Sequence, residues 1–438
     1  MLALTNTFII KIFLLKENKQ KGEIMNKKTI SIMLAYVGVL TGAGLASGQE
    51  LMQYFISFGI SGLFGLIAIG ILHVLVGGII LQLGSHYLAE SHIDVIEEVS
   101  SKYLTKFMDF ALIINCFLMG FVMIAGAGSN LNQQFGFKPW VGSLICTLLV
   151  IFIGMLDFDK VTKVIGAFTP LIIIFAILGA IYTFITIKPD WQSLNQIGQS
   201  VKSPLPNIGL STLNYFGLCM ISGISMAFVL GGSKTDSAEA GLGGMLGGLM
   251  VAILTALVGL TLFFTLPMIK DSDIPMQIVL ENIHPVLGLM MSLIIFGMIF
   301  NTAISLFYSA ARRFSDTENK FRRNLIIFTL MGFGLSFLGF KKLMSILYPI
   351  LGYLGMILTI ILVVAWFNER EEIKHEMRRR FAISVLTKRK LDDDEEFGKM
   401  EKEKLERLAE NSIIDNKEIK QAVHEEVKEE LEEENSEE

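Results

Sequence analysis

The sequence predicts an all-α integral membrane protein with about ten transmembrane helices. Hydrophobic residues make up 52% of the 438 residues and charged residues only 18%. Charge is absent from long stretches such as residues 61–82 and 240–267, and about 20 apolar residues are enough for a helix to cross a bilayer. Helices are expected because unpaired backbone groups are costly in lipid. Glycines and polar residues interrupt the first and sixth apolar segments, which predicts discontinuous helices 1 and 6.

Ten apolar segments are long enough to be spans. Their expected ranges are 29–58, 61–87, 107–133, 139–156, 161–187, 207–231, 240–267, 285–311, 324–339 and 343–367. Most connections are short. Residues 89–106, 188–206 and 268–284 form longer, polar connections that we expect to hold surface helices or lids.

The distribution of Lys and Arg predicts the orientation. In the short loops these residues are about twice as frequent on the side that holds the N-terminus, and this side is cytoplasmic by the positive-inside rule. Arg378, Arg379 and Arg380 follow the last span on the same side, whereas Lys341 and Lys342 argue against this placement of the last hairpin. We expect a multi-pass protein of the bacterial cell (inner) membrane with both termini cytoplasmic.

Three regions are expected along the chain. Residues 1–24 form an N-terminal extension, and translation is expected to begin at Met25; a short amphipathic anchor is the alternative. Residues 25–368 form the transmembrane transporter domain. The tail, residues 369–438, holds 15 Lys and Arg against 24 Asp and Glu, which predicts a helix-prone or disordered cytoplasmic segment. A regulatory or oligomerising coil stays open, and residues 429–438 are expected to be disordered.

The first span contains the motif Gly42-Ala-Gly-Leu-Ala-Ser-Gly-Gln-Glu50. Each glycine weakens a helix by about 1 kcal/mol, and a carboxylate in lipid must face protein or water. These features predict a helix that unwinds here and resumes near Ser47. The candidate substrate-binding residues of this segment are Gly42, Ala43, Gly44, Ser47, Gly48, Gln49 and Glu50.

Such a break would provide a polar site in the middle of the membrane. The first half-helix would offer carbonyl groups to a cation, and the second would offer N–H groups to an anion. Two other interpretations stay open. Ser47 and Glu50 have the spacing of a capping box, and the small residues suit close helix packing.

The sixth span has a similar interruption. Its candidate substrate-binding residues are Asn214, Tyr215, Phe216, Gly217, Ser222 and Gly223, of which Tyr215 or Phe216 could shape or gate a pocket. Spans one to five and six to ten have nearly equal lengths, so both breaks would fall in the first helix of a half. With five spans each, the halves would be inverted in the membrane, and paired breaks point to a transporter binding site.

The eighth span contains hydroxyl groups on one face, from Thr302 and Ser305. They could complete a sodium site against a carbonyl of the first span such as that of Ala43, because hard cations prefer oxygen ligands. The alternative is hydrogen bonding back to the helix backbone. Lys163 could replace sodium as a fixed charge, or extend to the membrane interface.

Other chemistry has no support in the sequence. Cys116, Cys146 and Cys219 lie in apolar segments and suit no disulfide or zinc pattern. The glycines between 241 and 248 resemble a packing face and lack the Lys of a phosphate loop. We therefore expect no enzyme activity, no metal, no cofactor beyond a sodium ion or proton as coupling ion, and no nucleic-acid partner.

The motif of the first span resembles the G-A-G-F-A-S-G-Q-E signature of YkvI-type bacterial membrane proteins, with Leu45 in place of the aromatic residue. Tyr348-Pro349 and Gly352-Tyr353 in the last span are similar as well. The resemblance covers about residues 25–367 and leaves the tail outside. It implies membership of the amino acid–polyamine–organocation superfamily and a LeuT-like fold, a 5+5 inverted repeat, but no substrate.

Two functions follow as hypotheses. The first is a secondary active transporter, sodium- or proton-coupled, of a small organic solute that resembles an amino acid. The alternative is a membrane sensor or signalling protein on a transporter scaffold, which would use its tail to bind a cytoplasmic protein. The expected partners are the lipid bilayer and a small-molecule solute.

Overall fold

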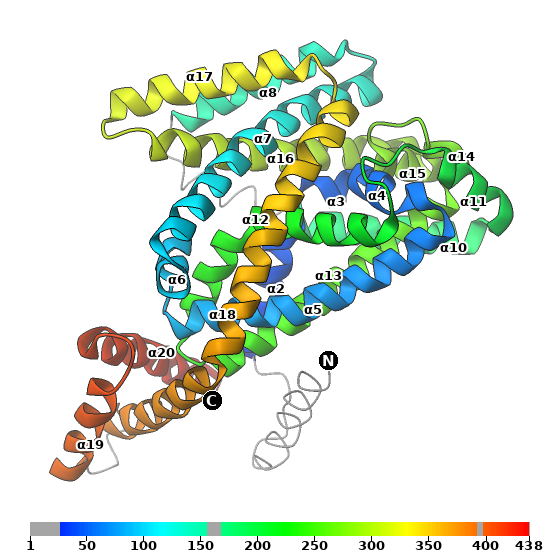
Figure 1. Ribbon diagram of the computed structural model, residues 1–438. Coiled ribbons are helices and arrows are strands. Elements are labelled where there is room, and N and C mark those ends of the chain that lie inside the picture. The colour runs from blue at the N-terminus through cyan, green and yellow to red at the C-terminus, as the bar shows by residue number, and fades with distance from the viewer. Residues whose placement is uncertain (1–26, 156–167, 392–396, 438) are drawn as a thin grey trace.

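The computed structural model describes residues 27–155, 168–391 and 397–437 (Figure 1). Within these ranges every regular element is a helix, so the all-α expectation is confirmed for the described part of the chain. The expected start at Met25 and the position of Lys163 lie outside the described residues.

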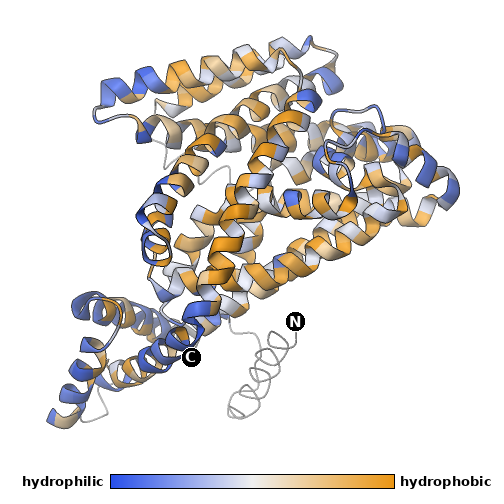
Figure 2. Ribbon diagram, in the orientation of Figure 1, coloured by the Kyte–Doolittle hydropathy of each residue, from blue (hydrophilic) through white to orange (hydrophobic). Residues whose placement is uncertain are grey.

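Each expected span coincides with one helix or with a group of short helices. Six of the described helices are long and apolar enough to cross a membrane: α5 (Ile60–His86), α7 (Lys102–Phe135), α12 (Ile208–Gly232), α13 (Ser237–Phe264), α16 (Pro285–Arg313) and α18 (Phe340–Leu391). Figure 2 shows the apolar residues along them. The remaining expected spans are α8 (Pro139–Gly154), α10 (Phe168–Thr186), α17 (Glu318–Ser336) and the divided first span.

The three longer connections contain short helices, as expected. These are α6 (His92–Val99), α11 (Trp191–Ser200), α14 (Leu266–Ile269) and α15 (Pro275–Ile283). Local sequence explains two of the starts. Ser91 and Asp94 form a capping box at α6, and the Asp190 carboxylate accepts bonds from the first backbone N–H groups of α11.

The membrane helices pack in two groups. The first comprises α2 (Lys27–Leu40), α5, α12 and α13, and the second comprises α7, α8, α16 and α17. The last of the membrane helices, α18, contacts α12 of the first group and α7 of the second. Glycines allow α5 and α13 to approach closely, since a Cβ at Gly244 would lie 2.4 Å from the Gly77 carbonyl oxygen. The packing interpretation of the glycines between 241 and 248 is confirmed.

The prediction of a break in the sixth span is wrong. Helix α12 runs from Ile208 to Gly232 without interruption. Its glycines serve close packing instead, because a Cβ at Gly217 would lie 2.2 Å from the Gly352 carbonyl oxygen of α18. Small residues in a membrane helix thus bring two backbones together without unwinding either. Only the first of the two expected discontinuous helices is present in the described residues, and the inverted repeat stays a prediction.

The tail is folded against the membrane domain. Helix α18 continues beyond the last expected span to Leu391, and α19 (Lys399–Glu410) and α20 (Asn416–Glu437) follow it (Figure 1). Where we expected disorder over residues 429–438, α20 continues to Glu437. The amphipathic spacing of its apolar residues explains this, because Ile419, Val423 and Val427 are buried.

Candidate functional site

The first span is interrupted at two points. Helix α2 ends at Leu40, and α3 (Ala43–Ser47) begins after two non-helical residues, Thr41 and Gly42. The Thr41 hydroxyl donates a hydrogen bond of 2.7 Å to the Val37 carbonyl, which closes the end of α2. The second interruption is at Gly48, between α3 and α4 (Gln49–Tyr54). The expected discontinuous first helix is therefore present.

Gly48 is at a position where a side chain would be strained. Its φ is +77°, in the left-handed region that glycine adopts without steric cost. A Cβ there would also lie 3.0 Å from Met276 Cγ and 3.1 Å from Leu262 Cδ1. The turn at Gly48 changes the direction of the chain, so that α4 directs Glu50 back toward α3.

The Glu50 carboxylate lies in the interior, between the break and α12. Glu50 is 8% exposed, and Tyr215 of α12 donates a hydrogen bond of 3.0 Å to its Oε2. The carboxylate occupies the space that a side chain on Gly44 would need, since a Cβ there would lie 1.6 Å from Oε1. Glycine at position 44 thus allows the carboxylate to lie against the break.

The capping-box interpretation of Glu50 is not realised. The residue that precedes α4 is Gly48, which has no side chain that could cap this helix. The Ser47 hydroxyl instead donates to the Gly44 carbonyl at 2.9 Å and accepts from the Gln49 backbone N–H at 3.2 Å. Ser47 therefore stabilises the turn, and the Glu50 side chain is available for contacts with other helices.

Tyrosines and Asn214 connect the break to α12 and α18. The rings of Tyr54 and Tyr215 have centroids 5.2 Å apart, and the Tyr54 hydroxyl donates to Asn214 Oδ1 at 3.2 Å. Asn214 Nδ2 donates in turn to the Pro349 carbonyl of α18 at 2.9 Å. Tyr348 is fully buried and interacts electrostatically with Glu50, although its hydroxyl makes no hydrogen bond of normal geometry within the described residues.

The sequence analysis missed Tyr54 and Tyr348 as site residues. Tyr54 lies on α4, four residues after Glu50, which ends the motif. Residues spaced i, i+4 lie on the same face of a helix, so the position of Tyr54 on the face of Glu50 could have been expected. Tyr348 lies in the Tyr348-Pro349 dipeptide of the last span, which carried part of the family resemblance. Only the packing of α18 against α12 brings Tyr348 to Glu50.

The other expected residues of α12 lie apart from Glu50. Phe216 packs against His73 of α5, with ring centroids 5.1 Å apart. Ser222 donates a hydrogen bond of 3.4 Å to Asn115 of α7, and Gly223 packs against Leu40 at the end of α2. Of the sixth-span candidates, the structure brings Asn214 and Tyr215 to the break.

The described part of the chain gives the carboxylate no basic partner. Among the described residues no Lys, Arg or His forms a salt bridge with Glu50, and its hydrogen-bond donor is a neutral phenol. Gln49 Oε1, also buried beside the break, has no hydrogen-bond partner within the described residues. Buried polar groups are costly when they lack a hydrogen-bond partner or a counter-charge.

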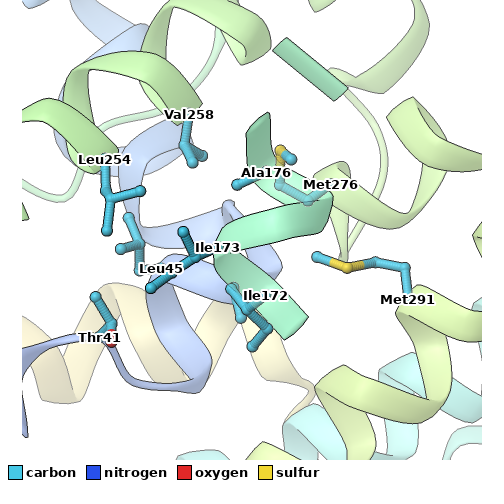
Figure 3. A pocket seen from close by; sticks show the side chains of 10 residues that line it. Thr41, Leu45, Ile172, Ile173, Ala176, Leu254, Val258, Met276 and Met291 are labelled. Atoms are coloured by element: carbon cyan, nitrogen blue, oxygen red, sulfur yellow. The ribbon is translucent and has the colours of Figure 1, made fainter. Parts of the chain in front are cut away.

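The space beside the break is small and apolar. A cavity of about 10 Å³ is lined by Thr41, Leu45 and Ala46 of the break and by side chains of α10, α13, α15 and α16 (Figure 3). This volume holds at most about one water molecule. The helices are therefore closed around the first interruption, and a solute would need a movement of one of them.

The expected ion site lies between two helices that pack together. Helix α3, which begins at Ala43, packs against α16, which carries Thr302 and Ser305. Both hydroxyl residues are partly buried. A sodium site here stays a prediction. No group of three His, Cys, Asp or Glu residues suited to a metal ion occurs in the described part of the chain.

The chain has similarities to solved structures and to curated sequences. No protein-family model matches the chain. The solved structure of MhsT in complex with L-phenylalanine is 13% identical, with a TM-score of 0.49, and the match covers 77% of this chain and 98% of MhsT. A manganese transporter from Eremococcus coleocola is 14% identical, with a TM-score of 0.38, over 82% and 76% of the two chains.

Curated sequences give similarities of higher identity. The membrane protein YkvI of Bacillus subtilis (strain 168) is 26% identical over 332 residues, which cover 74% of this chain and 92% of YkvI. The protein YyaD of the same organism is 24% identical over 334 residues, which cover 76% of this chain and 95% of YyaD. The resemblance carried by the Gly42–Glu50 motif is confirmed: this chain is a homologue of the YkvI and YyaD proteins.

Proposed function

We propose that this protein is a secondary active transporter of a small organic solute resembling an amino acid, coupled to sodium or protons. The observation that carries the proposal is the Glu50 carboxylate, which is buried at a broken membrane helix and has no basic partner among the described residues. A buried carboxylate in this setting is expensive unless it takes up a proton or a cation. Both are ways in which a carrier couples an ion gradient to a solute.

The backbone at the break supports a solute with both charges. By helix geometry, the last carbonyls of α2 and the first N–H groups of α3 have no partner within their own helices. Carbonyls favour an ammonium group and N–H groups favour a carboxylate. An amino-acid-like solute carries both groups, and this match is the reason for the proposed substrate class.

The proposal also requires a conformational change, because the closed cavity admits no solute. The division of the membrane helices into two groups gives such a change a physical basis. Glu50 lies on α4, which packs against α12 and α13 of the first group, and α10, α18 and the short helices contact both groups. Movement of one group against the other would open the break to one side of the membrane at a time.

The test begins with purified protein screened against amino acids and related metabolites, with and without sodium. A ligand that binds the folded state raises its melting temperature by mass action. Uptake of each hit is then measured in proteoliposomes with either a sodium or a proton gradient.

The decisive variant is Glu50→Gln, which keeps the size of the side chain and removes its charge. We expect gradient-driven uptake to fall at least tenfold with little change in melting temperature. Asp271→Asn, a charge removal at an exposed position, serves as the control and should transport normally. Wild-type uptake by Glu50→Gln would overturn the coupling role of this carboxylate.

The sensor hypothesis remains the alternative, and the folded tail is the observation that favours it. Because the tail packs on the membrane domain, a ligand-driven movement could be transmitted to it. A chain ending at Leu391 that retains gradient-driven uptake supports the transporter. Ligand-dependent capture of a cytoplasmic protein by the tail, together with no uptake of any stabilising ligand, would favour the sensor.

A further inference from the structure

The tail has an apolar core of its own that includes a residue of the membrane domain. Ile383 and Leu386 of α18 pack with Leu405 of α19 and Val423 of α20, and Leu88, which follows α5, joins them. The amphipathic helices α19 and α20 thus bury their apolar faces against α18 and the end of α5. This burial folds the tail back onto the membrane domain at the end where α2 begins.

Arg380 fixes the extension of α18 to the end of α5. Arg380 is 2% exposed, and its guanidinium donates to the carbonyls of Ser85 at 2.7 Å and His86 at 2.6 Å. These are among the last carbonyls of α5, which have no partner within that helix. Glu376, fully buried, accepts from Arg380 Nε at 2.9 Å and from the Ser412 hydroxyl of the turn between α19 and α20.

Helix α20 in turn holds the first turn of α2. Lys28 Nζ lies 2.6 Å from a carboxylate oxygen of Glu430 and 3.8 Å from one of Glu426. The side chains of Lys28 and Glu426 are only 11% and 12% exposed. Glu426 also accepts from the Thr235 backbone N–H at 2.9 Å and from the Thr235 hydroxyl, so that α20 bridges α2 and the turn between α12 and α13.

Helix α2 is separated from the rest of the first span by the break. It has 14 residues, and the break at Thr41 and Gly42 removes the helical hydrogen bonds that would otherwise continue it into α3. Among the described residues no atom lies within 4 Å of a Cβ added at Gly38, so the described part of the chain does not cover this side of α2. Its packing is mainly with α13 and α12. The first turn of α2 is furthest from the break, so contacts there restrict rotation of the helix about the break most strongly.

We propose that the tail is an intramolecular latch, in which Glu426 and Glu430 of α20 hold Lys28 and so keep α2 packed against α13. Release of the tail frees α2 to pivot at Thr41 and Gly42 and opens the break toward the tail side of the membrane. The effect of tail release on transport rests on the proposed function, whereas the contact between the tail and α2 does not. The position of α2 can be measured without any solute.

The experiment reports that position through a thiol. Ile32 is 1% exposed and faces Gly243 of α13, so the thiol introduced by Ile32→Cys is protected while α2 is packed. Cys116, Cys146 and Cys219 are first replaced by Ala. The rate of labelling by a water-soluble maleimide is then measured on the full-length protein, with and without the double change Glu426→Gln and Glu430→Gln.

We expect the double change to raise the labelling rate several-fold. The matched control is Glu429→Gln with Glu432→Gln, which removes the same charge from the same helix at exposed positions and should leave the rate unchanged. Lys28→Glu should raise the rate as well, and adding Glu430→Lys to it should lower the rate again. An unchanged rate in the Glu426 and Glu430 double variant would overturn the latch.

The result separates the latch from the proposed function. Faster labelling together with a changed uptake rate supports both. Faster labelling of a protein that transports none of its stabilising ligands supports the latch and counts against the transporter. Normal labelling in a variant with altered uptake would refute the latch and leave the transporter intact.

Discussion

The first span and helix α12 contain similar runs of glycine and polar residues but differ in structure. In the first span the helix stops at Leu40 and turns again at Gly48, whereas α12 is continuous from Ile208 to Gly232. The glycines explain the difference. Gly44 makes room for a carboxylate and Gly48 has a positive φ, while Gly217 faces the backbone of α18.

The comparison shows that glycine spacing alone does not predict a broken membrane helix. A glycine against a neighbouring backbone stabilises helix packing, and the helix stays intact. A glycine beside a buried charged side chain of the same segment leaves space for that side chain. The two roles predict different responses to the same substitution, and three glycine-to-alanine changes test them.

Gly217→Ala should have the largest effect on stability. The new Cβ would lie 2.2 Å from the Gly352 carbonyl oxygen and 2.6 Å from the Met356 backbone nitrogen, and neither backbone atom can move without separating α12 from α18. We expect a loss of roughly 1–3 kcal/mol, as for other overpacked interiors. Thermal unfolding in detergent measures it. A melting temperature equal to that of the wild type would show that α12 is not packed by this glycine.

Gly44→Ala should have a smaller effect on stability and a large effect on uptake. The new Cβ would collide with Glu50 Oε1, which is the end of a flexible side chain, so the carboxylate moves and loses its bond from Tyr215. Alanine also favours the helical conformation of α3 by up to about 1 kcal/mol. The melting temperature should stay close to that of the wild type while uptake is lost. Normal uptake would mean that the position of the carboxylate is not required.

Gly42→Ala should have the smallest effect. Its backbone is extended, with φ of −93° and ψ of −176°, which alanine also adopts, and no atom of the described residues lies within 4 Å of the added Cβ. We expect a stability change within about 0.5 kcal/mol and uptake near that of the wild type. A marked loss of uptake with a normal melting temperature would indicate that Gly42 contacts the solute directly.

The sequence determined the parts of this protein that depend on composition and on local chemistry. Long uncharged segments gave the membrane helices, because lipid leaves backbone groups no partner outside the helix. Polar connections gave short helices, and the Gly42–Glu50 motif gave the break, because a carboxylate and three glycines within one short segment conflict with an ordinary apolar helix.

Only the tertiary structure decided what each small or charged residue contacts. Whether Gly217 breaks α12 or packs it depends on α18, 135 positions away at Gly352. Tyr54 and Tyr348 join Glu50 because three helices meet there, and the tail is folded because α20 finds apolar and charged partners on the membrane domain. Periodicity reports which face of a helix is apolar. It does not report which neighbour covers that face, and this choice is made by the packing of the whole chain.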